Sequence, residues 1–263
     1  MDLGLNGKRA FVAGASRGLG YAAAHLLAQE GVRVAVNSRS AEACGIAARQ
    51  ITEATGIEAL AFSGNVTQPG EPDRLIETAA RELGGLDLLL TNSAGPPSGK
   101  FESFSEEDWR NAVDLVFLSH VHLIRAALPF LRQSSAPSVL TVTSYVAKQP
   151  IPNLVLSNSV RAATLGLTKS LALELGSEGI RINSILPGWT ITERVSEIMA
   201  HRAKVNQSQI EAEFAKQTSE IPLQRMGTPE EFARAAVFLL SPAASFITGV
   251  MLLVDGGVTK STF

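Results

Sequence analysis

Residues 9–20 of the chain read RAFVAGASRGLG, and this stretch decides the fold. Its first half is an apolar run typical of a buried strand, and a helical pattern begins where the glycines end. Gly14, Gly18 and Gly20 allow the backbone to turn sharply and to approach a phosphate closely. The helix that follows would offer free N–H groups and a favourable dipole to such an anion. The stretch therefore predicts a strand–turn–helix unit that binds a phosphate-containing ligand.

The spacing of these glycines departs from the usual dinucleotide fingerprint. That fingerprint is G-x-G-x-x-G, whereas the order here is G-x-x-x-G-x-G. The same residues also match the G-x-S-x-G turn of hydrolases, in which Ser16 would be the nucleophile. A hydrolase would need an acid and then a histidine late in the chain, and His201 is the one late histidine. We therefore favour the phosphate-binding interpretation.

Short β-rich runs alternate with longer helical patterns along the rest of the chain. Strands are expected in RAFVAG, VRVAVNS, EALAFSG, LDLLLTNS, SVLTVTS, IRINSIL and VMLLVDG, all nearly continuous apolar runs that suit a parallel sheet. Helices are expected at 17–30, 41–55, 70–83, 105–132 and 157–175. This alternation predicts an α/β, doubly wound Rossmann fold, with a seven-stranded parallel sheet and helices on both faces.

Residues 193–221 break the alternation because they are longer than one crossover helix requires. They are predicted to form two amphipathic helices, the second opened by a capping box at Ser208 and Glu211. An insertion after the carboxyl end of a strand is well placed to cover a ligand in the sheet crevice. We expect a single domain over residues 1–263 in which residues 193–221 form a helical substrate lid.

The composition limits the classes of function. Hydrophobic residues make up 45% of the 263 residues and charged residues 18%, enough for a sizeable core. A net charge of −2 argues against a nucleic-acid binder, which needs a basic face. No signal peptide or run of about 18 apolar residues is evident, so no membrane partner is expected. The single cysteine, Cys44, suits a reducing compartment, and we expect a cytoplasmic protein without a metal site.

Five short motifs together carry a family resemblance. They are GASRGLG at 14–20, NVT at 65–67, NSAG at 92–95, PGWTIT at 187–192 and ITGVMLLVDGG at 247–257. In this order they resemble the short-chain dehydrogenase/reductase family over nearly the whole chain, and within it the 3-oxoacyl-acyl-carrier-protein reductases. The resemblance implies oxidoreduction of a small carbonyl or alcohol substrate with a nicotinamide cofactor, in a homotetramer or homodimer. It also implies that His120 and His122, on the expected helix 105–132, lie at a subunit interface.

The resemblance assigns the cofactor to these motifs. Asn65 stands where the family usually has an aspartate that meets the adenine amino group, and an amide oxygen can accept the same hydrogen bond. The stretch PGWTIT is the one that would hold the nicotinamide carboxamide. The candidate cofactor-binding residues are Gly14, Ser16, Arg17, Gly18, Leu19, Gly20, Ser38, Arg39, Asn65, Val66, Asn92, Ala94, Gly95, Pro187, Gly188 and Thr192.

The end of the second strand favours NADP(H) over NAD(H). A site selective for NAD places an acid there to bind the ribose 2′-hydroxyl group. Here the strand ends in VNSRS, which contains no acid. Ser38 and Arg39, joined by Arg17 from the glycine-rich turn, are expected to bind a 2′-phosphate, since the guanidinium fork suits phosphate.

The catalytic residues that the resemblance implies are largely replaced. The family uses a serine, a tyrosine, a lysine and an asparagine, and Ser144 provides the serine. The tyrosine position, thirteen residues later, holds Ser157, and the lysine position holds Arg161. The asparagine position, eight residues after the tryptophan of EEDW, is taken to be Phe117, which would make that side of the site drier. No tyrosine follows Tyr145, so a shift of register does not restore the pattern.

Three hypotheses account for the replaced residues. In the first, Arg161 stabilises an oxyanion while Ser157, water or substrate supplies the proton. In the second, Tyr145 acts as the acid, aided by Lys148 in YVAK. In the third, the protein is an NADP(H)-binding sensor or regulatory protein with little or no turnover. For Ser157 and Arg161 the structural alternative is helix capping with an ion pair. The candidate catalytic residues are thus Ser144, Tyr145, Ser157 and Arg161.

Overall fold

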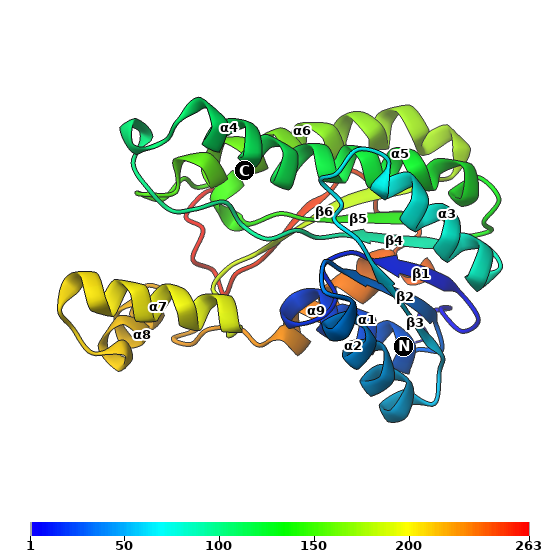
Figure 1. The fold of residues 1–263 in the computed structure, drawn as a ribbon, viewed down its shortest axis with the longest axis horizontal. Coiled ribbons are helices and arrows are strands. Elements are labelled where there is room, and N and C mark those ends of the chain that lie inside the picture. The colour runs from blue at the N-terminus through cyan, green and yellow to red at the C-terminus, as the bar shows by residue number, and fades with distance from the viewer. Residues whose placement is uncertain (1, 263) are drawn as a thin grey trace.

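The computed structural model describes residues 2–262 and confirms the predicted doubly wound fold (Figure 1). Seven parallel strands pair in the order β3-β2-β1-β4-β5-β6-β7. The order reverses between β1 and β4, which is where ligands bind in open sheets of this kind. The strands are β1 Arg9–Val12, β2 Arg33–Ser38, β3 Ala59–Ser63, β4 Leu88–Thr91, β5 Ser138–Val142, β6 Arg181–Pro187 and β7 Met251–Val254.

Helices cover both faces of the sheet because each strand is apolar on both sides. Along β1, Ala10 and Val12 pack into one core and Phe11 into the other, as alternation along a strand requires. The helices are α1 Gly18–Gln29, α2 Ala41–Thr55, α3 Glu71–Leu83, α4 Glu106–Val113, α5 Ser119–Leu131, α6 Val155–Leu175, α7 Glu193–Asn206, α8 Ile210–Ser219 and α9 Pro229–Leu240. Helices α1, α2 and α9 cover one face, and α3, α5 and α6 the other (Figure 1).

The helix predicted over 105–132 runs without a break from Glu106 to Leu131, with one irregular turn inside it. Helix α4 passes into a π-helical turn, Asp114–Leu118, before α5 begins. The hydroxyl of Thr164 on α6 donates to the carbonyl of Val116 at 3.1 Å, which satisfies an acceptor within the π turn. By length and composition alone the run Glu106–Leu131 could cross a membrane, but Leu123 on α5 is buried in the core of the sheet domain.

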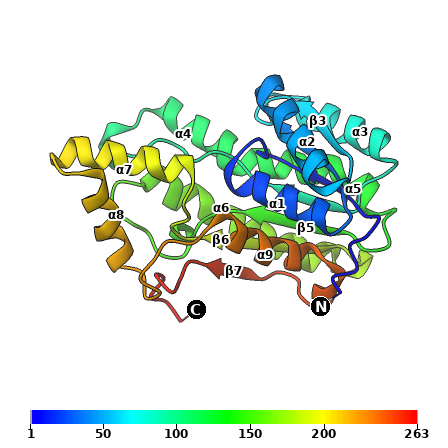
Figure 2. The ribbon, with the colours of Figure 1, turned by 90° about the horizontal axis from the view of Figure 1, so that it is seen from below.

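The lid region contains the two predicted helices, α7 and α8, at one end of the molecule (Figure 2). The capping box predicted for the second helix is wrong. Gln209 is the N-cap of α8 and makes no side-chain capping bond, while the Ser208 hydroxyl donates to Glu213 Oε1 at 2.6 Å. A capping box does open α9, at Thr228 and Glu231, a helix that the expected set did not include.

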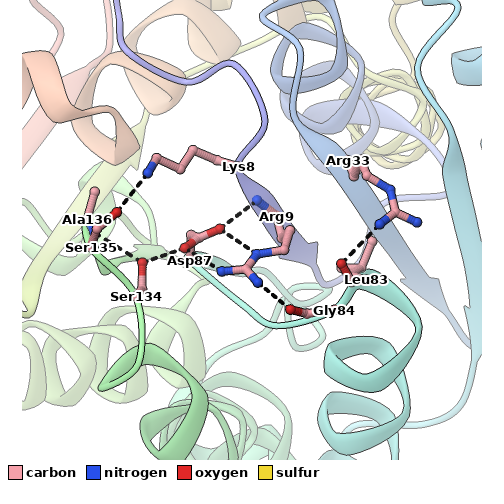
Figure 3. A network of polar contacts seen from close by, with 9 residues as sticks. All are labelled: Lys8, Arg9, Arg33, Leu83, Gly84, Asp87, Ser134, Ser135 and Ala136. Atoms are coloured by element: carbon pink, nitrogen blue, oxygen red, sulfur yellow. Dashed lines mark hydrogen bonds and ion pairs between the residues drawn. The ribbon is translucent and has the colours of Figure 1, made fainter.

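A network of hydrogen bonds and ion pairs lies at the end of the sheet opposite the glycine-rich turn (Figure 3). Arg9, the first residue of β1, donates from Nε to Asp87 Oδ2 at 2.8 Å and from Nη2 to Oδ1 at 3.0 Å. The Ser134 hydroxyl donates to the same carboxylate at 2.5 Å. Burial acts to raise the pKa of Asp87, but the hydrogen bonds from Arg9 and Ser134 outweigh it and hold that pKa below its usual range.

Candidate cofactor and substrate site

A cavity of about 440 Å³ lies at the carboxyl ends of the strands, a usual size and place for a small-molecule site. Its walls come from the β1–α1 turn, the ends of β2 to β6, and the first two turns of α6 and of α7. Every candidate residue from the sequence lines it except Gly20. Gly20 lies behind the turn, where an added Cβ would be 2.2 Å from the Gly14 carbonyl oxygen.

The glycine-rich turn is shaped to fit a phosphate group. Gly14 and Gly18 both have φ of +60°, a conformation that side chains disfavour. An added Cβ at Gly14 would lie 2.8 Å from Asn92 Nδ2, which itself donates to the Gly14 carbonyl at 3.2 Å. Helix α1 begins after Arg17 without a side-chain cap, so its first N–H groups are left for a ligand. These features fit the pyrophosphate of a dinucleotide.

The end of β2 presents no carboxylate to the cavity. Ser38 and Arg39 line the cavity there, and Arg39 is exposed. The Ser38 hydroxyl donates to the backbone carbonyl of Ser40 at 3.1 Å. Arg17 forms an ion pair with Glu193 at the start of α7, and both side chains are about two-thirds exposed. Arg17 is thus within reach of the cavity, but a phosphate would have to replace Glu193 as its partner.

The side-chain oxygen of Asn65, which was predicted to accept from the adenine amino group, accepts hydrogen bonds from Thr67 instead. Its Oδ1 accepts from the backbone N–H of Thr67 at 3.2 Å and from the Thr67 hydroxyl at 3.0 Å. Both lone pairs of the oxygen are therefore in use, and the expected bond from an adenine amino group to that oxygen is disfavoured. The Nδ2 group has no partner among residues 2–262, so Asn65 is better placed to donate than to accept.

Ser157 and Arg161 lie one turn apart on α6 and contact each other. Arg161 Nε donates to Ser157 Oγ at 3.1 Å, and Arg161 Nη1 donates to the carbonyl of Thr143 at 2.8 Å. Each residue is only 7% exposed. Burial lowers the pKa of Arg161 to about 10, which leaves it protonated at neutral pH.

The structural alternative for this pair, capping with an ion pair, is wrong on both counts. Helix α6 begins at Val155, with Leu154 at the N-cap, so Ser157 lies inside the helix and does not cap it. No carboxylate lies within ion-pair distance of Arg161 among residues 2–262. Because Ser157 Oγ accepts from Arg161, its own hydroxyl hydrogen is free to donate into the cavity. Ser144 Oγ likewise accepts, from the Val146 N–H at 3.4 Å.

Tyr145 lies in a different environment from Ser144. It is 5% exposed and packs in an apolar cluster with Trp189, Met199 of α7 and Met226. Burial raises the pKa of the Tyr145 phenol, and no hydrogen bond joins it to the Lys148 ammonium group within the described residues. An acid that works near neutral pH needs the opposite shift, so this geometry does not favour Tyr145 as the substitute acid.

Comparison with known proteins decides the family. A family model described as enoyl-(acyl carrier protein) reductase matches residues 14–259. The chain belongs to the short-chain dehydrogenase/reductase family. Among its relatives in the family, 7α-hydroxysteroid dehydrogenase of Escherichia coli is 32% identical, over 97% of this chain and 96% of that protein. The 3-oxoacyl-acyl-carrier-protein reductase of Staphylococcus aureus is 29% identical over 95% and 98%. The predicted resemblance is therefore confirmed.

Solved structures of the family agree closely with this fold. L-sorbose reductase from Gluconobacter frateurii, complexed with NADPH and L-sorbose, has a TM-score of 0.95 and 29% identity, over 99% of this chain and 100% of that one. An NADPH-bound short-chain oxidoreductase from Pseudomonas aeruginosa, described as having an atypical catalytic centre, has a TM-score of 0.89 and 30% identity, over 97% and 98%.

Neither Phe117 nor His120 lies where the sequence analysis predicted. Phe117 packs in an apolar cluster with residues of α4 and α6 and does not line the cavity, whereas Leu115 does. His120 is 1% exposed inside the protomer, so its expected place at a subunit interface is wrong. Its Nδ1 lies 2.6 Å from Thr91 Oγ1. Burial, together with the positive charge of Arg161, lowers the pKa of His120 to about 3 and keeps the ring neutral.

Sequence reasoning missed much of the substrate end of the cavity. Its apolar wall comes from the segment after β5 and from α7. The motifs gave no signal for these residues, because apolar side chains in a loop and on an amphipathic helix look the same whether they line a cavity or pack in a core. They are Val146, Ile151, Leu154, Val195 and Ile198.

Proposed function

We propose that this protein is an NADP(H)-dependent oxidoreductase that interconverts small carbonyl compounds and alcohols through an altered catalytic site. One observation carries the proposal. A single cavity joins the glycine-rich turn and the acid-free end of β2 to a wall that contains Ser144, Ser157 and Arg161. A cofactor lying along the cavity would therefore reach from its phosphates to the three polar side chains. NADPH in two of the related structures supports the choice of cofactor.

The residues of this chain divide into two groups in the proposed mechanism. At one end, Arg39 and Arg17 would hold the 2′-phosphate, with Arg17 exchanging Glu193 for the phosphate. The Ser38 hydroxyl would join them by exchanging the Ser40 carbonyl for the phosphate. When bound, NADPH supplies a hydride to the carbonyl carbon of the substrate. We further propose that α7 and α8 act as a lid of the single domain, since Glu193 comes from the first turn of α7.

The other group handles the negative charge that forms on the carbonyl oxygen. Arg161 is a buried cation in this wall, and such a charge stabilises an oxyanion more strongly than it would in water. The hydroxyl of Ser157 accepts from Arg161 Nε, which polarises its O–H bond for donation to the oxyanion. Ser144 orients the carbonyl with its free hydroxyl hydrogen. The carbonyl thus gains one hydride and one proton, and water returns the proton to Ser157.

A second candidate function is supported by one observation. The phenol that lines the cavity, Tyr145, has a raised pKa, and Arg161 remains protonated near neutral pH. A site without an acid tuned to neutral pH suits a cofactor-binding sensor with little turnover. In either case we propose a cytoplasmic homotetramer or homodimer, consistent with the family and with the buried thiol of Cys44.

NADPH binding and turnover separate the two functions. Binding is measured by titrating protein into NADPH and following its fluorescence, and turnover by the loss of NADPH absorbance with a panel of aldehydes and ketones. An oxidoreductase should lose most of its turnover in Ser157→Ala and Arg161→Gln, while Ser98→Ala, which removes another cavity serine, keeps it. Tight NADPH binding without turnover on any carbonyl would support the sensor. Failure to bind either nicotinamide cofactor would contradict both functions.

A further inference from the structure

The guanidinium group of Arg161 has no counter-charge among residues 2–262, which the structure describes. A buried arginine is ordinarily paired with a carboxylate, because leaving a charge unpaired away from water is costly. Here two of the five N–H donors have protein acceptors, the Ser157 hydroxyl and the Thr143 carbonyl. The remaining donors, including both on Nη2, have no partner among residues 2–262. A nearly fully buried cation is therefore left with an open fork.

The groups around Arg161 do not supply a negative charge. His120, whose ring the Arg161 charge influences, is neutral and forms its hydrogen bond with Thr91. On the loop after β4, an added Cβ at Gly95 would lie 3.7 Å from Arg161 Nη2, so a bare stretch of backbone faces the open end of the fork. Gly95 and Arg161 both line the cavity. The fork is thus open toward the ligand space.

More positive than negative side chains line the cavity. Arg17, Arg39, Arg161 and Arg194 are among its lining residues. Within the described part of the chain Glu193 is the one carboxylate that lines it, and Glu193 is already paired with Arg17. The phosphates of the proposed cofactor would neutralise the arginines at the end of β2 and the glycine-rich turn. They would leave Arg161 unneutralised, because its contacts lie at the other end, on α6 and after β5. Ribose hydroxyl groups are uncharged and do not provide the missing negative charge.

The wall beside Arg161 is otherwise apolar. Val146, Ile151 and Leu154 come from the segment between β5 and α6, and Val195 and Ile198 from α7. A ligand that fits this space has an apolar body and one anionic head. The head is best a planar carboxylate, since the guanidinium fork binds it through two parallel hydrogen bonds.

We propose that the substrate is an oxo acid, or the corresponding hydroxy acid in the reverse direction, and that Arg161 binds its carboxylate. This inference rests on the proposed function and specifies its substrate class. The open Nη donors hold the carboxylate, and the hydroxyls of Ser144 and Ser157 donate to the adjacent carbonyl oxygen. Arg161 then acts in binding as well as in stabilising charge, which explains why an arginine, with its fork, occupies this position.

The first test compares two ligands of the same shape in the wild-type protein. 4-Methyl-2-oxopentanoate and 4-methyl-2-oxopentanamide share an apolar body and a ketone, and differ in the charge of the head group. Binding is measured by calorimetry with the protein saturated in NADP⁺, so that no reduction occurs and the phosphate-binding arginines are already occupied. The oxo acid should bind about 100-fold more tightly, as expected for a charge-assisted pair. Equal affinities would overturn the inference.

The second test assigns the preference to one side chain. Arg161→Gln should remove the preference for the acid, and Arg161→Lys should keep part of it. Arg194→Gln removes an exposed cation from the rim of the same cavity and should leave the preference intact. A folded Arg161→Gln protein that still prefers the acid would overturn the assignment. If Arg161→Gln does not fold, the comparison of acid with amide in the wild type and in Arg161→Lys still decides.

The same measurements separate this inference from the proposed function. Preferential binding of the acid without reduction by NADPH would contradict the oxidoreductase but leave the carboxylate site standing. Reduction of the amide as readily as the acid, with equal affinity, would support the oxidoreductase and exclude the carboxylate site.

Discussion

His120 should make the stability of this protein depend on pH between about pH 5 and pH 7. The ring is buried, hydrogen-bonded through Nδ1 to Thr91, and its pKa falls from 6.5 to about 3 on folding. Between those two values the unfolded chain binds a proton that the folded chain does not. The contribution of His120 to the stability is therefore fully present above about pH 6.5 and is lost as the pH falls.

The size of the effect follows from the two pKa values. At about pH 5 the unfolded histidine is protonated 1.5 pH units below its pKa, while the folded one is still neutral. Each unit corresponds to about 1.4 kcal/mol, so acidification from about pH 7.5 to about pH 5 should lower the free energy of unfolding by about 2 kcal/mol. Carboxylates with lowered pKa, such as Asp87 and Glu231, lose their contribution mainly below about pH 4.5, and the small part lost by about pH 5 would be the same in a variant without His120.

Urea denaturation followed by tryptophan fluorescence measures this difference at the two pH values. His120→Gln keeps a polar side chain for Thr91 but cannot be protonated, so its stability should change far less with pH than that of the wild type. His122→Gln, on the same helix, is the matched control and leaves His120 in place. If His120→Gln loses as much stability on acidification as the wild type, within about 0.5 kcal/mol, the reasoning is refuted.

Three further predictions test the cofactor cradle and the catalytic wall. Gly14→Ala should weaken NADPH binding at least about tenfold, because Gly14 has a φ of +60° and an added Cβ there would crowd Asn92. Gly45→Ala is the control, since Gly45 lies in a helix with open space around it, and this variant should bind NADPH as the wild type does in the fluorescence titration. Arg39→Ala should weaken NADPH binding by about tenfold or more and leave NADH binding unchanged, and an equal loss for both cofactors would contradict the 2′-phosphate assignment. The double variant Ser157→Tyr, Arg161→Lys should raise the rate of reduction of uncharged ketones in the NADPH absorbance assay; no gain in a folded, NADPH-binding variant would mean that more than the proton donor has changed.

Ser157 and Arg161 show how far the sequence alone could predict the candidate site. The sequence identified Ser157 and Arg161 by their distance from Ser144, and both do line the cavity. The alternative of helix capping with an ion pair was wrong, because the Arg161 guanidinium donates to the carbonyl of Thr143, which lies just after β5. Spacing along one chain carries no information about which acceptors a neighbouring strand brings to a side chain, or about the absence of a carboxylate there.

The burial of His120 and the hydrogen-bond partners of Asn65 also could not be predicted from the sequence. His120 was expected at a subunit interface, and its neutral, buried state follows from the packing of α5 against the end of β4. Asn65 was expected to present its oxygen to a ligand, but the turn that follows β3 uses that oxygen for Thr67. In each case the residue type was informative, but the partners of the side chain depended on neighbours brought close by the fold.

The sequence by itself determined the doubly wound sheet, the glycine-rich turn and the acid-free end of β2. These follow from local patterns, since strands buried on both faces must be apolar throughout and glycine alone accommodates the crowded turn. Only the tertiary structure decided the electrostatics of the catalytic wall. It brings α6, α5 and the end of β5 together so that Arg161 is buried with no acid beside it among residues 2–262. The cost of an unpaired buried charge points to a ligand that carries the missing negative charge.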